Sequence, residues 1–257
     1  MIPYFASETY QLFGITFRTW GTLVALGYAL GTYLAWRRAK TKGLDQNRIL
    51  DLAFWILIAA FIGARLFHVL FYDPSYYFAH PLDAIDPRKP GYSMFGGLIG
   101  AALMFTGFVR KQELNFLTCA DALVWGLPWG ISIGRIGCFL IHDHPGLVTA
   151  FFLGVRYPDG LIRHDLGLYL SLIGFATGGL FLLVDRFLRD TRYAIRDTGL
   201  WLGIFMIIEG LTRFSLDFLR IADARYFGLT PTQWLSIPLA VGGAWLFFRA
   251  VRMKKMV

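Results

Sequence analysis

The feature that most constrains this chain is a series of apolar runs, each long enough to cross a membrane. A transmembrane helix needs about 20 mostly apolar residues, and seven segments meet this requirement. The predicted spans are residues 17–36, 50–72, 93–109, 118–140, 167–187, 199–220 and 233–249. The runs recur along the whole chain without a polar half or a long linker. We therefore expect a single domain, 1–257, with an all-α fold: a polytopic membrane protein of about seven transmembrane helices.

The distribution of charge indicates the orientation of the chain. Charged residues make up 16% of the sequence, below the roughly 25% typical of soluble domains. The net charge of +8 would suit nucleic acid, but 15 of the 25 basic residues follow the first, third, fifth and seventh predicted helices. The positive-inside rule makes that side cytoplasmic. We expect the N-terminus outside, the C-terminus in the cytoplasm, and no nucleic-acid partner. The clustered basic residues are Arg37, Arg38, Lys40, Lys42, Arg48, Arg110, Lys111, Arg186, Arg189, Arg192, Arg196, Arg249, Arg252, Lys254 and Lys255.

Three arginines lie at a similar depth within predicted spans. Arg65, Arg135 and Arg213 each precede the outer end of an outward-running helix by five to seven residues, which places them about 10 Å below the outer surface at 1.5 Å per residue. An ionisable side chain inside a span is costly and usually functional. Because arginine forks match phosphate geometry, the three side chains predict a site for a phospholipid phosphate.

The sixth predicted helix carries a charged stripe along one face. Its members are Glu209, Arg213, Asp217 and Arg220, at spacings of four, four and three residues. One interpretation is a self-neutralising ladder that lowers the cost of insertion. The other is that the ladder orients Arg213 towards a buried polar chamber, and the two are compatible.

The segment His142-Asp143-His144 follows the fourth predicted helix, just beyond Arg135. Two histidines and a carboxylate are metal-ligand types, but a spacing of two residues is not a strong ligand signature. General acid–base chemistry at the membrane surface suits histidine better, and a plain surface role remains open. We expect no metal ion and no organic cofactor. Cys138 lies nearby, and a buried cysteine is more often a small apolar residue than a nucleophile.

Glycines and one helix start add weaker signals. Pairs of glycines four residues apart, such as Gly96 and Gly100, favour close helix packing in lipid. Gly96 and Gly97 also follow Ser93 at the predicted start of the third span. Free backbone N–H groups at a helix start favour anions.

Four stretches together resemble the prolipoprotein diacylglyceryl transferase family. They are residues 63–72 (GARLFHVLFY), 93–100 (SMFGGLIG), 134–146 (GRIGCFLIHDHPG) and 212–220 (TRFSLDFLR), in the family's order and approximate spacing. Residues 163–169 and 232–238 add further matches, and the likeness covers nearly the whole chain.

The resemblance implies a specific reaction in the bacterial cytoplasmic membrane. Members move the diacylglyceryl group of phosphatidylglycerol onto the lipobox cysteine thiol of a prolipoprotein and release glycerol 1-phosphate. It also implies seven helices with the N-terminus outside. Arg135 and Arg213 match the family's essential arginines, and Asp143 and Asp217 stand where the family usually has glutamates. The predicted catalytic residues are Arg135, Arg213, His142, Asp143 and His144, and the predicted phosphatidylglycerol-binding residues are Arg65, Gly96, Gly97, Gly134, Arg135, Gly146, Arg213 and Asp217.

Several positions depart from the family's pattern. Phe95 replaces the usual histidine before Gly-Gly, Cys138 replaces an asparagine, and Trp20 replaces a tyrosine. Glu209 replaces another tyrosine, and Leu170 a glutamate. Two alternatives therefore stay open: a diverged transferase on the same scaffold that uses another acceptor, and a non-catalytic membrane protein that binds or transports lipid.

Overall fold

The computed structural model describes residues 1–257 except 87, 191–198, 222–224 and 254–257. Four of the clustered basic residues, Arg192, Arg196, Lys254 and Lys255, lie outside the described residues. The chain divides into two compact units, one of Met1–Arg38 with Ala120–Val257 and one of Ala39–Cys119. The prediction of a single domain stays a prediction.

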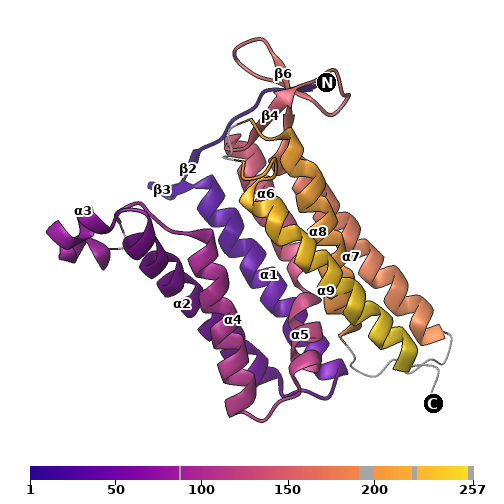
Figure 1. Ribbon diagram of the computed structural model, residues 1–257. Coiled ribbons are helices and arrows are strands. Elements are labelled where there is room, and N and C mark those ends of the chain that lie inside the picture. The colour runs from indigo at the N-terminus through magenta and orange to yellow at the C-terminus, as the bar shows by residue number, and fades with distance from the viewer. Residues whose placement is uncertain (87, 191–198, 222–224, 254–257) are drawn as a thin grey trace. The chain divides into compact units, whose positions relative to one another are not determined.

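Helices account for most of both units (Figure 1). The first unit contains α1 (Thr19–Thr41), α6 (Leu127–Ile141), α7 (Leu166–Asp190), α8 (Leu200–Leu216), the 3₁₀ turn η2 (Asp217–Leu219) and α9 (Pro231–Met253), and most of α5 (Phe116–Val124). The second contains α2 (Gln46–Phe71), α3 (Pro74–Ala79), the 3₁₀ turn η1 (Pro81–Ala84) and α4 (Met94–Lys111).

The prediction of a helical membrane protein is confirmed. Among the residues that the structure describes, three helices are long and apolar enough to cross a membrane: α2, α7 over Leu166–Leu188 and α9 over Pro231–Arg252. The pair α5 and α6 makes a fourth if it forms one span with a bend of 40°. The other predicted spans coincide with α1, α4 and α8. These three helices are less clearly membrane-spanning by length and composition. Gly, Thr and Tyr lower the apolar content of α1, α4 ends in the charged residues Arg110 and Lys111, and α8 has only 17 residues.

The fourth predicted span, 118–140, is broken in the structure. Helix α5 ends at Val124 and α6 begins at Leu127. Pro128 lies in the first turn of α6. Its missing N–H costs nothing there, because the first N–H groups of a helix have no intrahelical partner. In the interior of a longer helix the same proline would remove a hydrogen bond, so α5 does not continue smoothly into α6. The backbone of Gly126 also packs directly on Gly31 of α1, so the break lies at a close helix contact.

Glycines allow the closest helix contacts within each unit. In the second unit, Gly63 of α2 packs on Gly96 and Gly100 of α4 with no room for a Cβ atom. In the first unit, Gly27 of α1 packs in the same way on Gly130 of α6. Small residues at four-residue spacing permit such approach in lipid, so the prediction of tight packing at these glycines is confirmed.

Short strands at one end of the first unit show that an all-α description is incomplete. A four-stranded sheet has the order β1-β5-β6-β4, formed by Ile2–Pro3, Val155–Arg156, Ile162–Asp165 and Pro145–Val148. Strands β2 (Thr9–Leu12) and β3 (Ile15–Arg18) form a hairpin before α1. Strands of two to four residues are too short for apolar alternation to reveal. Strand β6 runs directly into α7 and so fixes the sheet to that helix.

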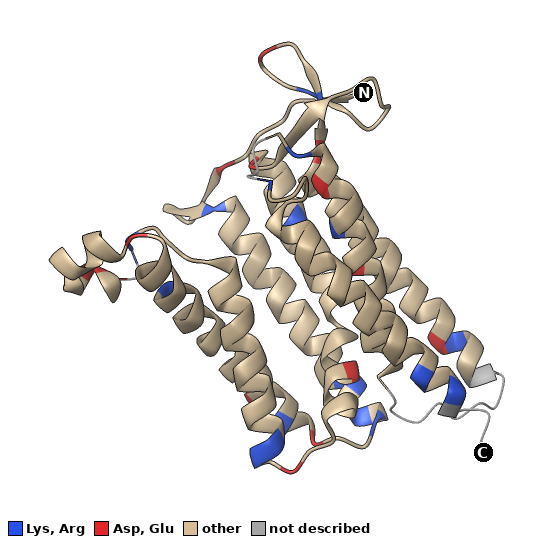
Figure 2. Cartoon of the chain, viewed as in Figure 1, with Lys and Arg blue, Asp and Glu red and all other residues tan. Residues whose placement is uncertain are grey.

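Basic residues gather at the helix ends remote from this sheet (Figure 2). In the first unit these are the C-terminal ends of α1, α7 and α9. At the same end Arg38 pairs with Asp185 at 2.8 Å and lies 4.0 Å from the ring centroid of Trp125. Trp125 packs with Phe181 and Trp201 in a buried cluster.

Candidate active site

Arg135 of α6 and Arg213 of α8 lie within electrostatic range of each other in the first unit. Arg135 lies in the second half of α6, and Arg213 lies in the last turn of α8. Arg213 Nε donates to Glu209 Oε1 at 2.6 Å, and both Arg213 and Glu209 are close enough to act electrostatically on Arg135. Two guanidinium groups with one carboxylate leave an excess of positive charge, which suits a bound anion.

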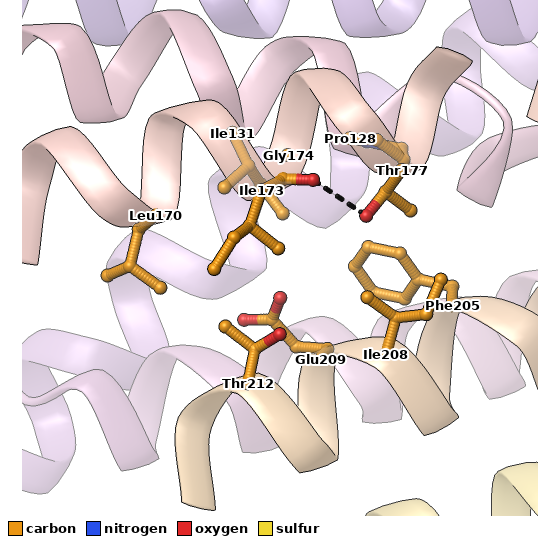
Figure 3. A pocket seen from close by; sticks show the side chains of 10 residues that line it. All are labelled: Pro128, Ile131, Leu170, Ile173, Gly174, Thr177, Phe205, Ile208, Glu209 and Thr212. Carbon is orange, nitrogen blue, oxygen red and sulfur yellow. Dashed lines mark hydrogen bonds between the residues drawn. The ribbon is translucent and has the colours of Figure 1, made fainter. Parts of the chain in front are cut away.

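A pocket between α6, α7 and α8 adjoins this pair (Figure 3). Its lining is mainly apolar, with the carboxylate of Glu209 and the hydroxyl of Thr212 on the α8 side. The lining residues are Pro128, Ile131, Leu170, Ile173, Gly174, Thr177, Phe205, Ile208, Glu209 and Thr212. The pocket and the arginine pair thus share Glu209, which lines the pocket and accepts the hydrogen bond of Arg213.

His142 forms a turn that reverses the chain after α6. Its backbone is left-handed, with φ of 50°, and its side chain is buried. Its Nδ1 lies 2.7 Å from Asp165 Oδ2, and its Nε2 lies 3.1 Å from the carbonyl oxygen of Phe5. Tyr4 stacks on the ring at 4.4 Å. Both ring nitrogens are therefore engaged with acceptors, and His142 ties the turn to the sheet.

The turn brings Asp143 and His144 back over the last turn of α6. His144 Nδ1 is hydrogen-bonded to Asp143 Oδ1, and the backbone of His144 accepts from Leu166 N at 3.2 Å. Cys138 of α6 lies against His144, and Arg135 Nη1 donates to Cys138 Sγ at 3.7 Å. The Asp143 carboxylate, with a smaller contribution from Cys138, raises the pKa of His144 to about 9. A connected polar cluster thus runs from Asp143 to Arg135.

Gly146 and Asp217 fix this loop to the end of α8. Gly146 pairs with Arg220 across a β-bridge, and a Cβ atom there would meet His164 and the backbone of Leu219. Asp217 is buried, accepts from the Thr230 hydroxyl and lies 3.5 Å from Arg220 Nε. In the structure these two residues therefore hold the loop and helix together. Gly134 lies one residue before Arg135 and packs on Val24 of α1.

The remaining predicted residues belong to the second unit. The Arg65 guanidinium is enclosed by backbone carbonyls of residues 83–91: its Nη1 donates to Pro90 and Gly91 at 2.8 Å, and its Nε donates to Ala84 at 3.0 Å. This geometry favours a loop-holding role for Arg65 over the predicted phosphate contact. Gly96 and Gly97 begin α4, where the Ser93 side chain accepts from Gly96 N at 3.4 Å.

Two residues of this arrangement had no assigned role in the sequence prediction. Asp165, the partner of His142, is 23 residues away in sequence, and no local pattern connects them. Cys138 was taken as a departure from a motif, and its contact with His144 depends on the left-handed turn between them.

Comparison with known proteins decides the family. The model for prolipoprotein diacylglyceryl transferases matches residues 8–249. The chain belongs to the prolipoprotein diacylglyceryl transferase family. It is an enzyme of the transferase class, as the resemblance predicts.

Curated relatives agree over nearly their full length. The chain is 32% identical to a phosphatidylglycerol–prolipoprotein diacylglyceryl transferase of Nitrosomonas europaea, with 97% of this chain and 91% of the relative covered. It is 34% identical to the enzyme of the same name from Bordetella parapertussis, with 91% and 90% covered. For that of Finegoldia magna the identity is 31%, with 96% of each chain covered.

The departures from the diacylglyceryl transferase pattern fall in different parts of the structure. Cys138, Glu209 and Leu170 surround the arginine pair and its pocket. Phe95 lies in the first turn of α4, in the second unit. Trp20 lies in the first turn of α1, where its backbone packs on Gly137. Two of the five replacements therefore change direct partners of Arg135 and Arg213, and a third lines the pocket.

Proposed function

We propose that this protein transfers the diacylglyceryl group of phosphatidylglycerol to the lipobox cysteine thiol of a prolipoprotein. The second product is glycerol 1-phosphate. The observation that carries the proposal is the juxtaposition of Arg135 and Arg213 beside an apolar pocket, in a chain of this family. The printed names of the relatives supply the donor and the acceptor.

The reaction is a displacement at a glyceryl carbon. The acceptor thiol loses its proton to solvent by way of the Asp143–His144 pair, its sulfur forms a bond to the carbon, and the carbon–oxygen bond to phosphate breaks. The electron pair of that bond leaves with the phosphate oxygen, so negative charge grows on the phosphate. Fixed cations aimed at developing charge are an effective form of catalysis. Arg135 and Arg213 supply them here, and the excess positive charge of the pair leaves them able to bind the phosphate.

The other site residues divide by position. Asp143 and His144, which contact the Arg135 cluster, take part in activating the acceptor thiol, whose ordinary pKa near 8.5 leaves it mostly protonated. His142 positions their turn. Gly134, Gly146 and Asp217 shape the site around the lipid headgroup by holding α6, the loop and η2 in place. Arg65, Gly96 and Gly97 organise a loop and a helix start in the second unit, and their part in donor binding stays a prediction.

The same proposal includes the topology. Seven spans place the N-terminus and the sheet outside and the C-terminus in the cytoplasm of a bacterial inner membrane, with α5 and α6 forming one broken span. The apolar helices and the basic residues at the helix ends remote from the sheet support this arrangement. The site then lies in the outer half of the membrane, where phosphatidylglycerol headgroups and secreted prolipoproteins meet.

The test is an in vitro transfer assay with purified protein, labelled phosphatidylglycerol and a lipobox peptide. We expect Arg135→Ala and Arg213→Ala each to lower the rate by about 10²–10³, the usual loss for one transition-state charge contact. Arg156→Ala, on an exposed strand of the same unit, is the matched control and should keep the wild-type rate. No labelled peptide from folded protein that binds phosphatidylglycerol would contradict the proposed acceptor.

A further inference from the structure

The structure groups three metal-ligand side chains that are not grouped by sequence spacing. Cys138 Sγ, a carboxylate oxygen of Asp143 and a ring nitrogen of His144 all lie within 4.8 Å of one another. His142 belongs to the same His-Asp-His segment, but its ring points away from this group and contacts Asp165 and the carbonyl oxygen of Phe5. The left-handed backbone at His142 causes both outcomes, because it folds residues 143 and 144 over α6.

Contrary to the expectation of no metal ion from sequence spacing, we infer that Cys138, Asp143 and His144 form a site for a thiophilic divalent metal ion of the zinc type, whose fourth position takes the acceptor thiol. This inference rests on the proposed function for the identity of the fourth ligand. Zn²⁺ prefers tetrahedral sites of Cys, His and carboxylate ligands, and three protein ligands with one open position are the pattern of catalytic sites. The thiolate sulfur favours zinc over magnesium or calcium.

The geometry needs only a small adjustment to close on a metal. Bond lengths of about 2.0–2.3 Å place tetrahedral ligand atoms about 3.5 Å apart, compared with the present limit of 4.8 Å. His144 would exchange its hydrogen bond to Asp143 for the metal. Both side chains are partly exposed, at 27% and 33%, so the ion can enter from the loop side while Cys138 closes the buried side.

The charges balance beside the arginine pair. A divalent ion with one thiolate, one carboxylate and one neutral imidazole has no net charge, so it adds no net repulsion to Arg135. Binding also draws Cys138 Sγ away from Arg135 Nη1, whose contact is long at 3.7 Å. The guanidinium would then be able to bind the lipid phosphate.

The metal would activate the thiol that the reaction needs. A thiol that coordinates zinc is deprotonated outright, and its proton passes to solvent. The metal-bound sulfur then forms the bond to the glyceryl carbon, the carbon–oxygen bond breaks, and the electron pair leaves on the phosphate. The thioether product is a weaker ligand than the thiolate, so water takes the fourth position again. No oxidant or reductant is involved.

Cobalt(II) provides a direct test without any lipid. Purified protein is stripped with a chelator and titrated with Co²⁺, which gives visible bands of a tetrahedral site and a near-ultraviolet thiolate-to-cobalt band. We expect the thiolate band in the wild type and in Cys119→Ser, whose cysteine is buried elsewhere, and no such band in Cys138→Ser. Asp143→Asn and His144→Gln should weaken Co²⁺ binding by more than about 10-fold, since even indirect support of a metal ligand is worth 10–100-fold.

A second measurement tests the fourth position. A lipobox peptide with its cysteine should change the cobalt spectrum, and the same peptide with serine should not. The inference is overturned if folded wild-type protein shows no thiolate band, if Cys138→Ser keeps it, or if the cysteine peptide leaves the spectrum unchanged. Full transfer activity in metal-free protein would also overturn it and would leave the proposed function intact. Cobalt and peptide binding without any lipid transfer would instead refute the proposed function alone.

Discussion

At the scale of a single residue, Arg65 is a buried charge whose hydrogen bonds go to the backbone carbonyls of a nearby loop. Its guanidinium donates to carbonyls of residues 83–91 and lies near the rings of Tyr77 and Tyr92, at 5.3 and 5.4 Å. One side chain thus organises a whole loop.

Arg65→Lys should therefore destabilise the loop. Lysine keeps the charge but loses the planar fork, and hydrogen bonds to a charged group are worth about 1.5–3 kcal/mol each. We expect a loss of about 1–3 kcal/mol in the free energy of unfolding and faster proteolysis within residues 83–91, measured by thermal unfolding in detergent and limited digestion. Unchanged stability together with weaker phosphatidylglycerol binding would favour the phosphate contact instead.

The two histidines flanking Asp143 should respond differently to substitution. His142→Gln breaks a buried pair with Asp165, a change that typically costs about 3–5 kcal/mol. His144→Gln removes a partly exposed pair, worth about 1 kcal/mol or less. We expect His142→Gln to lower the thermal midpoint and His144→Gln to lower transfer activity with a nearly unchanged midpoint. The reverse pattern would assign the catalytic role to His142.

Residue roles were the least predictable part of the site. The positions of Arg135 and Arg213 near the C-terminal ends of helices could be predicted from the sequence, because they depend on local apolar runs and motifs; their depth in the membrane stays a prediction. The cage around Arg65 and the Cys138–His144 contact depend on where loops return. The carbonyls that hold Arg65 lie 18 to 26 residues away, a separation at which sequence spacing carries no information.

At the scale of elements, glycine contacts decide how closely helices pack. A Cβ atom on Gly100 of α4 would collide with the backbone of Ala59 in α2, whereas Gly107 of the same helix faces open space. We expect Gly100→Val to cost at least about 1–3 kcal/mol through overpacking and Gly107→Val to cost little, by thermal unfolding in detergent. Equal losses would show that helix propensity, not the contact, controls stability.

Element positions could be predicted for the helices and not for the strands. Each predicted span corresponds to a helix or a helix pair because long apolar runs are a strong signal. The break at Gly126 was missed, although Pro128 marked it, since hydropathy alone runs across it. The sheet was missed because its strands pair across distant segments, such as Ile2 with Val155.

At the scale of the whole molecule, the proposed topology has a direct test. A cysteine in place of Asp159, in the exposed loop between β5 and β6, should react with a membrane-impermeant maleimide in intact spheroplasts. A cysteine in place of Lys111, at the end of α4, should react only after permeabilisation. The native cysteines are buried, which keeps the background low. Labelling of both positions from outside would contradict an alternation of seven spans.

The buried pair of His142 and Asp165 carries a consequence for evolution. Because that pair sets the turn, it positions Asp143 and His144 without touching substrate. Substitutions at Asp165 should then be epistatic with substitutions at Cys138 or His144: harmful while the cluster is intact, and nearly neutral for activity once it has been lost. The His142–Asp165 pair would therefore have to arise in evolution before the cluster of Cys138, Asp143 and His144 could contribute to activity. The left-handed backbone of His142 thus constrains the order in which these residues could be acquired.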